Sequence, residues 1–166
     1  MKTIQVEPLT TERFLPFGRY ASMIEPKGNS LGDPPIQFFG DMLQVDLGGN
    51  ETLPSFGVCR CSPRELIIDQ AEHHNRTCEV MLPIDQDVWV QLAPANAGAA
   101  PDFEKFRVFL VPKGTLLSLR PGVWHHAPFT IGKTPANVLI QLPERTYIND
   151  AICYTFSETE RIQVNP

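Results

Sequence analysis

Proline and glycine set the tightest limit on what this chain can fold into. The sequence has 16 prolines and 11 glycines among 166 residues, and they are spread over its whole length. Proline removes a backbone hydrogen-bond donor and glycine weakens a helix, so the stretches between them are too short and too often interrupted for long helices. The sequence therefore predicts a protein built from short strands and turns.

Eight segments rich in Val, Ile, Phe and Leu are predicted to be strands. They recur with turn signals between them, a pattern typical of a β-sandwich or barrel. The predicted strands are residues 42–47, 55–61, 78–82, 88–92, 106–111, 116–119, 136–141 and 152–156.

The beginning of the chain offers one short helix. Thr10 is placed to cap it, Phe14 lies within it, and Phe17 and Gly18 end it. Residues 24–35 form a loop rich in Pro, Gly, Asn and Asp, which we expect to act as a lid or as an arm that faces a partner.

The composition indicates one globular domain over residues 1–166, with 42% hydrophobic and 20% charged residues. A net charge of -5 without a Lys or Arg cluster argues against a nucleic-acid partner, because such binding depends on basic residues that displace counterions. The apolar runs fall short of the roughly 20 residues that cross a bilayer. The first residues also lack the apolar core of a signal peptide, so we expect a cytoplasmic protein without a membrane partner.

The four cysteines form no C-x-x-C pair of the kind that binds zinc or exchanges disulfides. We interpret them as buried, reduced thiols and assign them no chemistry. Cys59 and Cys61 lie two residues apart in a predicted strand, which points both to the same face.

All four histidines fall in two adjacent pairs, His73-His74 and His125-His126, which lie far apart in the sequence at the edges of predicted strands. Successive side chains of a strand alternate between its faces, so at most one histidine of each pair points inward. If His74 and His125 share the barrel interior, a neighbouring carboxylate of Glu72 or Glu79 completes a mixed N/O ligand set. Such a set suits a divalent transition metal such as Ni, Mn, Fe or Zn.

Two other interpretations of the histidines stay open. In the first, they are ordinary polar residues, one of each pair hydrogen-bonded inside a barrel and the other solvated. In the second, the pocket is catalytic without a metal, and Glu79 or a histidine is the general base.

The spacing Gly122-x-x-His125 after Pro121, and His74-x4-Glu79 in an earlier strand, resembles the two metal-binding motifs of the cupin superfamily. The resemblance implies an all-β, cupin-like β-barrel of the double-stranded β-helix or jelly-roll type. The chain departs from these motifs in two places. Glu72 replaces the usual first histidine, and Gln86 replaces the glycine expected after Glu79.

Most of the chain also resembles the ureidoglycolate lyase family, in the opening Pro8-Leu9-Thr10, in the stretch from Glu72 to Pro83, and above all in Trp124-His125-His126. That resemblance implies an enzyme that splits ureidoglycolate into glyoxylate and urea, forms dimers and is associated with a divalent metal. The family pattern of a His-Pro pair followed by Gly-Thr-Gln or Ser-Thr-Gln is replaced here by His74-Asn75 and Thr77-Cys78-Glu79. An asparagine-rich segment expected near residue 35 is also absent.

On this hypothesis His74, Glu79 and His125 are the catalytic residues, and Glu72, His74, Glu79 and His125 are the candidate metal ligands. The substrate carboxylate requires a cation, and Arg60, Arg76 and Arg145 are the candidates, with Arg60 preferred because it ends an apolar strand. Trp124 and His126 complete the expected substrate pocket, although Trp124 more often packs a barrel than contacts a substrate.

Two alternatives use the same pocket. One is a cupin isomerase or lyase that acts on a sugar or another hydroxy acid. The other is a non-catalytic barrel that binds a small molecule, because a fold alone does not fix a function. In each case we expect a small-molecule ligand, and we expect a homodimer because such barrels often pair their exposed strand edges.

Overall fold

Short strands dominate the computed structural model, which describes residues 1–28, 30–32, 34, 37–49 and 52–166. The prediction of an all-β, cupin-like barrel with a short N-terminal helix is confirmed. The strands of the described residues are β1 (Lys2–Pro8), β2 (Gly18–Ser22), β3 (Pro54–Cys61), β4 (Ile67–Ile68), β5 (Gln70–His73), β6 (Glu79–Pro83), β7 (Val88–Ala93), β8 (Arg107–Val111), β9 (Thr115–Leu119), β10 (Trp124–His125), β11 (Phe129–Thr130), β12 (Ala136–Pro143), β13 (Ile152–Thr155) and β14 (Ile162–Asn165). The helices are α1 (Thr11–Phe14), the 3-10 helix η1 (Phe103–Lys105) and α2 (Thr146–Asn149).

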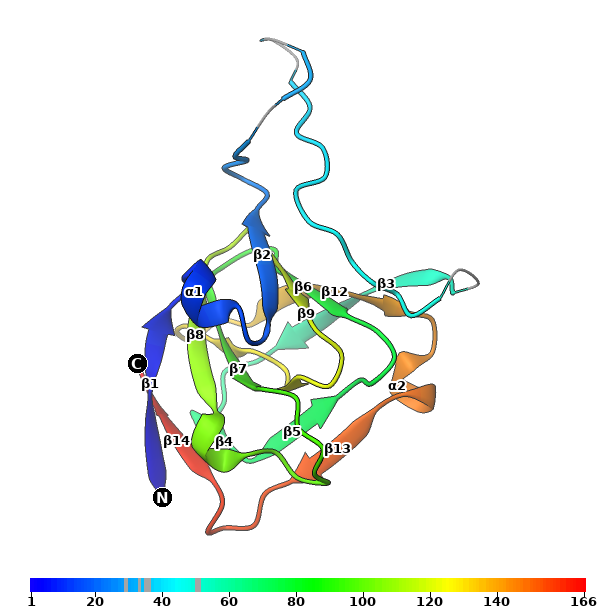
Figure 1. Ribbon diagram of the computed structural model, residues 1–166. Coiled ribbons are helices and arrows are strands. Elements are labelled where there is room, and N and C mark those ends of the chain that lie inside the picture. Colours follow the sequence, from blue (N-terminus) through cyan, green and yellow to red (C-terminus); the bar gives the residue numbers. More distant parts are fainter. Residues whose placement is uncertain (29, 33, 35–36, 50–51) are drawn as a thin grey trace.

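The strands form two sheets that curve around a shared interior (Figure 1). One sheet has the order β13-β5-β10-β7-β8-β1-β14-β4, with β11 added beside β7, and the other has the order β2-β9-β6-β12-β3. β1 runs parallel to β8 and to β14, whereas the other strand pairs are antiparallel. β3 and β2 are the edges of the smaller sheet, and among the described residues β3 pairs with β12 alone.

The main hydrophobic core lies between the sheets. Met81 of β6, Leu117 of β9 and Val138 of β12 face Val90 of β7 and Phe109 of β8, and all are buried. This arrangement follows from the strand pleat, which sends alternate side chains inward from each sheet. This core sets the relative orientation of the two sheets and therefore which residues of the two sheets face each other.

The predicted helix at the start of the chain is confirmed as α1. Thr10 caps it, with its side-chain oxygen 3.3 Å from the backbone nitrogen of Arg13. Phe14 is fully buried and meets Phe109 edge-on at 5.5 Å between ring centroids. The helix therefore closes one end of the core rather than forming part of the site.

Seven of the predicted strands coincide with β3, β6, β7, β8, β9, β12 and β13, but the predicted strand at residues 42–47 is wrong. That segment is irregular, and its apolar side chains Met42 and Leu43 border a groove on the outer face of the smaller sheet instead of pairing with a strand. One backbone bond, from Cys78 N–H to Asp46 O at 2.9 Å, ties it to the barrel.

The predicted loop at residues 24–35 lies partly outside the described residues. Its described residues belong to a long connection between β2 and β3 that extends away from the barrel (Figure 1). Leu31 and Phe38 form an isolated antiparallel β-bridge in this connection. In the ranges that the structure describes, helices are all too short or too polar to cross a membrane.

Candidate metal centre

Three buried side chains from distant parts of the chain converge inside the barrel: His74, Glu79 and His125. Glu79 Oε2 lies 3.0 Å from His74 Nε2 and 2.9 Å from His125 Nε2. One ligand atom from each residue lies within 4.8 Å of the others. The structure thus brings together the three residues that the sequence assigned to catalysis.

The register of the sheets produces this convergence. His125 on β10 pairs with Glu72 on β5, which places the residue after β5, His74, beside it. Glu79 begins β6 in the opposite sheet, so its side chain approaches from the facing wall. The two predicted motifs therefore meet across the barrel, as the cupin resemblance implies.

A glycine closes the turn that leads into β10. Gly122 has φ 78°, a left-handed conformation that glycine adopts without strain. Its N–H donates to His74 O at 2.6 Å, and a Cβ here would lie 3.0 Å from the Cβ of Ala95. Gly122 thus links the two histidine segments directly.

Both histidine rings are held by backbone carbonyls. His74 Nδ1 lies 2.6 Å from Asp150 O, and His125 Nδ1 lies 2.8 Å from Val123 O. These carbonyls accept the Nδ1–H of each ring, which leaves both Nε2 atoms directed at Glu79. Carbonyl partners of this kind orient metal-binding histidines in proteins.

The charges of the group are strongly coupled. Burial alone would raise the pKa of Glu79, but the charge of His125 and hydrogen bonds from both histidines lower that pKa to about 2. Burial would lower the pKa of His125, yet the carboxylate of Glu79 raises it to about 9. The hydrogen bond to Glu79 also raises the pKa of His74 against its burial. Without a metal, a buried carboxylate therefore faces protonated imidazole.

A cavity of about 210 Å³ opens in front of these residues. Its wall combines polar groups at the base with apolar side chains from both sheets, a composition typical of small-ligand sites. The lining residues are Cys59, Glu72, His74, Glu79, Met81, His125, Ala127, Pro128, Ile140, Leu142 and Tyr147. Glu72 therefore lies on the wall, outside the group of three, so its predicted place among the metal ligands is not supported.

The donor set fits a divalent transition metal. Two imidazole nitrogens and one carboxylate oxygen are ligands that Fe, Mn, Ni and Zn accept, and all three residues line the cavity. Both Nε2 atoms lie within 3.0 Å of Glu79 Oε2, so the three ligand atoms already face one another. A bound cation would be held by these three residues and would satisfy the buried carboxylate.

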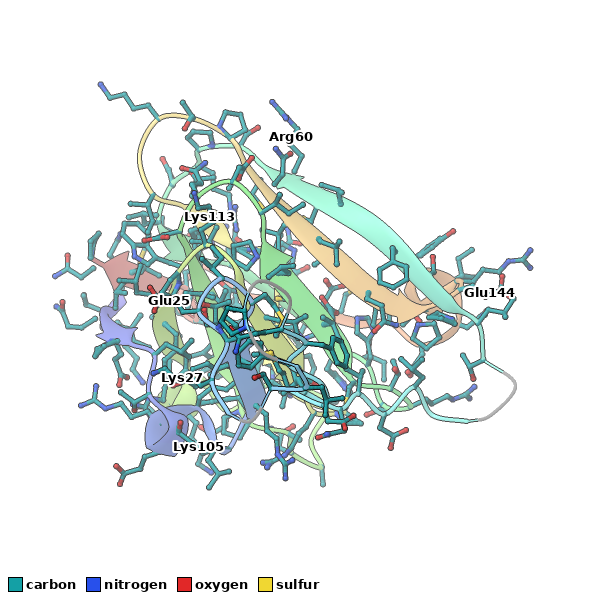
Figure 2. All side chains as sticks on the ribbon, turned by 90° about the horizontal axis from the view of Figure 1, so that it is seen from above. Glu25, Lys27, Arg60, Lys105, Lys113 and Glu144 are labelled. Carbon is teal, nitrogen blue, oxygen red and sulfur yellow. The ribbon has the colours of Figure 1, made fainter. Side chains whose placement is uncertain are left out.

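The three arginines predicted to bind a substrate carboxylate do not line this cavity. Arg60 lies between Cys59 and Cys61 on β3, so strand alternation turns it outward, and Figure 2 shows it pointing away from the barrel. Arg76 is exposed and borders a different depression, beside Thr77 and Asp150. Arg145 is exposed ahead of α2 with φ 59°. None of the three arginines therefore faces the candidate metal centre, and their predicted role in binding a substrate carboxylate stays a prediction.

Trp124 and His126 also lie off the cavity wall. Trp124 is buried in the second hydrophobic cluster and donates from Nε1 to Asn96 Oδ1 at 3.1 Å, and its ring lies tilted against that of His73 at 4.2 Å between centroids. Trp124 therefore packs the barrel, as the alternative interpretation held. His126 is half-buried, which lowers its pKa, and it points away from the group of three. Alternation thus separates the members of both histidine pairs.

Sequence reasoning missed Asp150, because nothing in its local pattern sets it apart. Its carboxylate accepts from Asn75 N–H at 3.1 Å and Arg76 N–H at 2.8 Å, while its backbone oxygen holds His74. Tyr147, on α2, and Cys59, on β3, were also missed as lining residues.

The cysteines are all free, but only Cys61 is buried and Cys153 is exposed, so the prediction of four buried thiols is partly wrong.

The fold and the site define a cupin-like barrel whose interior carries a buried two-histidine, one-carboxylate group that could hold a metal ion. The family model of ureidoglycolate lyase matches residues 1–164, and the chain belongs to that family of lyases. A ureidoglycolate lyase of Burkholderia mallei (strain NCTC 10229) is 27% identical over 165 residues, covering 90% of this chain and 95% of that protein.

Other comparisons extend over similar lengths. A ureidoglycolate lyase of Pseudomonas syringae pv. tomato is 25% identical over 171 residues, covering 100% of this chain and 97% of that protein. A dTDP sugar isomerase from Desulfovibrio desulfuricans G20 superposes with a TM-score of 0.45 at 14% identity, covering 91% of this chain and 86% of that chain.

Proposed function

We propose that this protein is a carbon–nitrogen lyase that splits ureidoglycolate into glyoxylate and urea with a divalent metal held by His74, Glu79 and His125. The observation that carries the proposal is the buried group of these three residues in a member of the ureidoglycolate lyase family. The cavity in front of the group, about 210 Å³, has room for a small hydroxy acid.

Ureidoglycolate is a carbinolamide, so its cleavage moves one proton and breaks one bond. The hydroxyl loses its proton, the C–O bond becomes a carbonyl, and the electron pair of the breaking C–N bond passes to the urea nitrogen, which takes up a proton. A divalent ion such as Ni, Mn, Fe or Zn would supply the positive charge that binds the hydroxyl and carboxylate and lowers the hydroxyl pKa. The protein must then supply a group that takes and returns a proton.

Glu72 is our choice for that group. It lies on the cavity wall, outside the three ligands, and its backbone pairs with His125. Its carboxylate would accept the hydroxyl proton and deliver it to the departing nitrogen, serving first as base and then as acid. Glu79 is unsuited to this role, because its carboxylate is already held by His74 and His125 and would be a ligand of the metal.

Purified protein, prepared without chelator or affinity metal, tests the proposal. We expect near-stoichiometric divalent metal by mass spectrometry and glyoxylate release from ureidoglycolate, with both lost in His125→Ala. The matched control is His126→Gln, the neighbouring histidine that lies off the cavity wall. Bound metal without glyoxylate release would indicate a sugar or another hydroxy acid as the substrate. If the protein showed no bound metal and no glyoxylate release, a barrel that only binds small molecules would be the better account.

We also propose that the protein is a cytoplasmic homodimer. Four free thiols are consistent with a reducing compartment. β3 is an edge strand whose outward side chains Phe56 and Val58 are 70% and 60% exposed. We name these two residues the outer β3 face. We propose that a second copy of the chain covers this face, because two copies of an unpaired apolar edge strand can pair antiparallel with each other.

A further inference from the structure

Cys59 and Cys61 form a close pair of thiols that the lyase reaction does not use. They lie at alternate positions of β3, pair with Val138 and Ala136 of β12, and both point to the inner face of the sheet. Their sulfur atoms are 3.6 Å apart, and both thiols are free. This separation is short enough for the two sulfurs to react with each other.

The pair has a defined position beside the candidate metal centre. Cys59 is half-buried and lines the same cavity as His74, Glu79 and His125, whereas Cys61 is buried behind it. A small reagent that enters the cavity therefore reaches Cys59 first. In the part of the chain that the structure describes, β3 has a neighbouring strand on one side only, so its backbone can shift without breaking a second ladder.

The surroundings give the two thiols different roles. The hydrogen bond with Cys61 lowers the pKa of Cys59 to about 7, against the effects of burial and of Glu79, and the guanidinium of Arg64 adds to the lowering. The same contact and burial raise the pKa of Cys61. Arg64 is held in place by the carbonyls of Ala127 and Pro128. Cys59 is thus the nucleophilic thiol, and Cys61 is the resolving thiol.

We propose that Cys59 and Cys61 are a peroxide-sensitive dithiol site on the wall of the cavity. The sulfur of Cys59 attacks one oxygen of hydrogen peroxide, the O–O bond breaks, and water leaves once the departing oxygen has taken a proton. The product is the sulfenic acid of Cys59. Cys61 then attacks that sulfur, the S–O bond breaks, a second water leaves, and a disulfide forms. In balance, two thiols lose two electrons and two protons, and one peroxide becomes two waters.

Forming this bond requires a local bend of β3, and that strain makes the bond labile. At about 3.3 Å per residue, the Cα atoms of residues two apart in a strand are separated by about 6.6 Å. Disulfides span Cα separations of roughly 4.4 to 6.8 Å but hold their Cβ atoms only about 3.5 to 4.5 Å apart, which is closer than the parallel side chains of an extended strand, so β3 must bend locally for this bond to close. Strained disulfides are reduced readily, which suits a reversible modification. Closing the bond would also turn the sulfur of Cys59 away from the cavity wall.

Peptide mapping tests the site without any measurement of lyase activity. The protein would be treated with hydrogen peroxide, its remaining thiols alkylated, and the denatured chain digested with trypsin. Because Arg60 lies between the two cysteines, trypsin separates them, and a disulfide would appear as two linked peptides that dithiothreitol releases. We expect this linked pair to form before Cys153, which is exposed, and Cys78, which is half-buried, lose reactivity.

Three variants sharpen the test. Cys61→Ser should leave the sulfenic acid of Cys59 to be trapped by dimedone, and Arg64→Gln should slow the first step severalfold. Cys153→Ser is the matched control and should form the linked pair at the unchanged rate. Earlier oxidation of Cys153, irreversible oxidation of Cys59 without the disulfide, or a disulfide between two chains would each overturn the proposal.

The effect on the cavity rests on the proposed function and is measured separately. If the protein cleaves ureidoglycolate, peroxide should raise KM severalfold while metal content stays constant, and dithiothreitol should reverse the change. If the protein proves inactive on ureidoglycolate, the linked peptides still decide whether the dithiol site exists. The two proposals therefore fail independently.

Discussion

Glu79 and His125 hold opposite charges in a buried site, so the metal-free protein should respond to pH in a definite direction. The pKa of His125 is raised from its ordinary 6.5 to about 9, so its stabilising effect is complete below 6.5 and is lost as pH rises through 9. The pKa of Glu79 is lowered from 4.5 to about 2, so its effect is complete above 4.5 and is lost as pH falls through 2. The metal-free protein should therefore be most stable between about pH 4.5 and 6.5.

Metal binding should follow the opposite trend at alkaline pH. An ion that takes Nε2 of His125 must displace its proton, so metal affinity should rise from pH 6.5 toward 9, with protons released on binding. Urea unfolding of chelator-treated protein and calorimetric metal titration in buffers of different ionisation heat would measure both trends. In Glu79→Gln the stability loss between pH 6.5 and 9 should disappear, and an unchanged loss would show that another group causes it.

Asp150 positions His74 and the two residues that follow it in the chain. Removing its carboxylate in Asp150→Ala frees the N–H groups of Asn75 and Arg76, so His74 should be less well oriented. Residues that orient metal ligands typically contribute roughly 10- to 100-fold to metal affinity, and we expect a loss in that range by competition with a chelator. Asp85→Ala removes a similar carboxylate, which accepts from Asn137 N–H at 3.0 Å far from the site, and should leave metal affinity unchanged.

Among the elements, the sequence predicted the long strands better than the short ones. Segments such as β7 and β12 carry enough apolar residues to stand out alone. β10 has two residues and β5 has four, and they exist because their neighbours in the sheet position them. The segment at residues 42–47 has the composition of a strand, but its apolar side chains cover the outer face of a sheet instead. Local composition does not distinguish these two ways of burying an apolar side chain.

Gly122 connects two elements that the site requires, so its substitution should affect both folding and metal binding. In Gly122→Ala the backbone keeps a φ of 78°, which costs an L-residue roughly 1–2 kcal/mol. The added Cβ would also press on Ala95 and weaken the bond from Gly122 N–H to His74 O. We expect a lower urea midpoint together with weaker metal binding. Gly132→Ala, at φ 100° with open space around its Cβ, is the control and should lower the midpoint without changing metal affinity.

At the scale of the whole molecule, the site follows from long-range register that the sequence does not display. The histidine pairs and the cupin-like spacing were sufficient to predict that His74, Glu79 and His125 come together. They were insufficient to choose between Glu72 and Glu79, because that choice depends on which sheet each carboxylate enters. Arg60 was misplaced for a related reason, since one residue of strand alternation decides which face a side chain takes.

The outer β3 face makes the assembly of the whole molecule testable. A stable interface buries roughly 800 Å² on each partner, and a charge placed at its apolar centre without a partner costs several kcal/mol. Val58→Lys should therefore convert a dimer into a monomer, as measured by size-exclusion chromatography with light scattering. Val58 points away from the cavity, opposite to Cys59, so metal content should not change.

The control is Lys105→Glu in η1, an exposed charge reversal that Figure 2 places far from Arg60 of β3, and it should remain dimeric. A wild-type protein that is monomeric at high micromolar concentration would contradict the dimer, and a dimeric Val58→Lys would move the interface elsewhere.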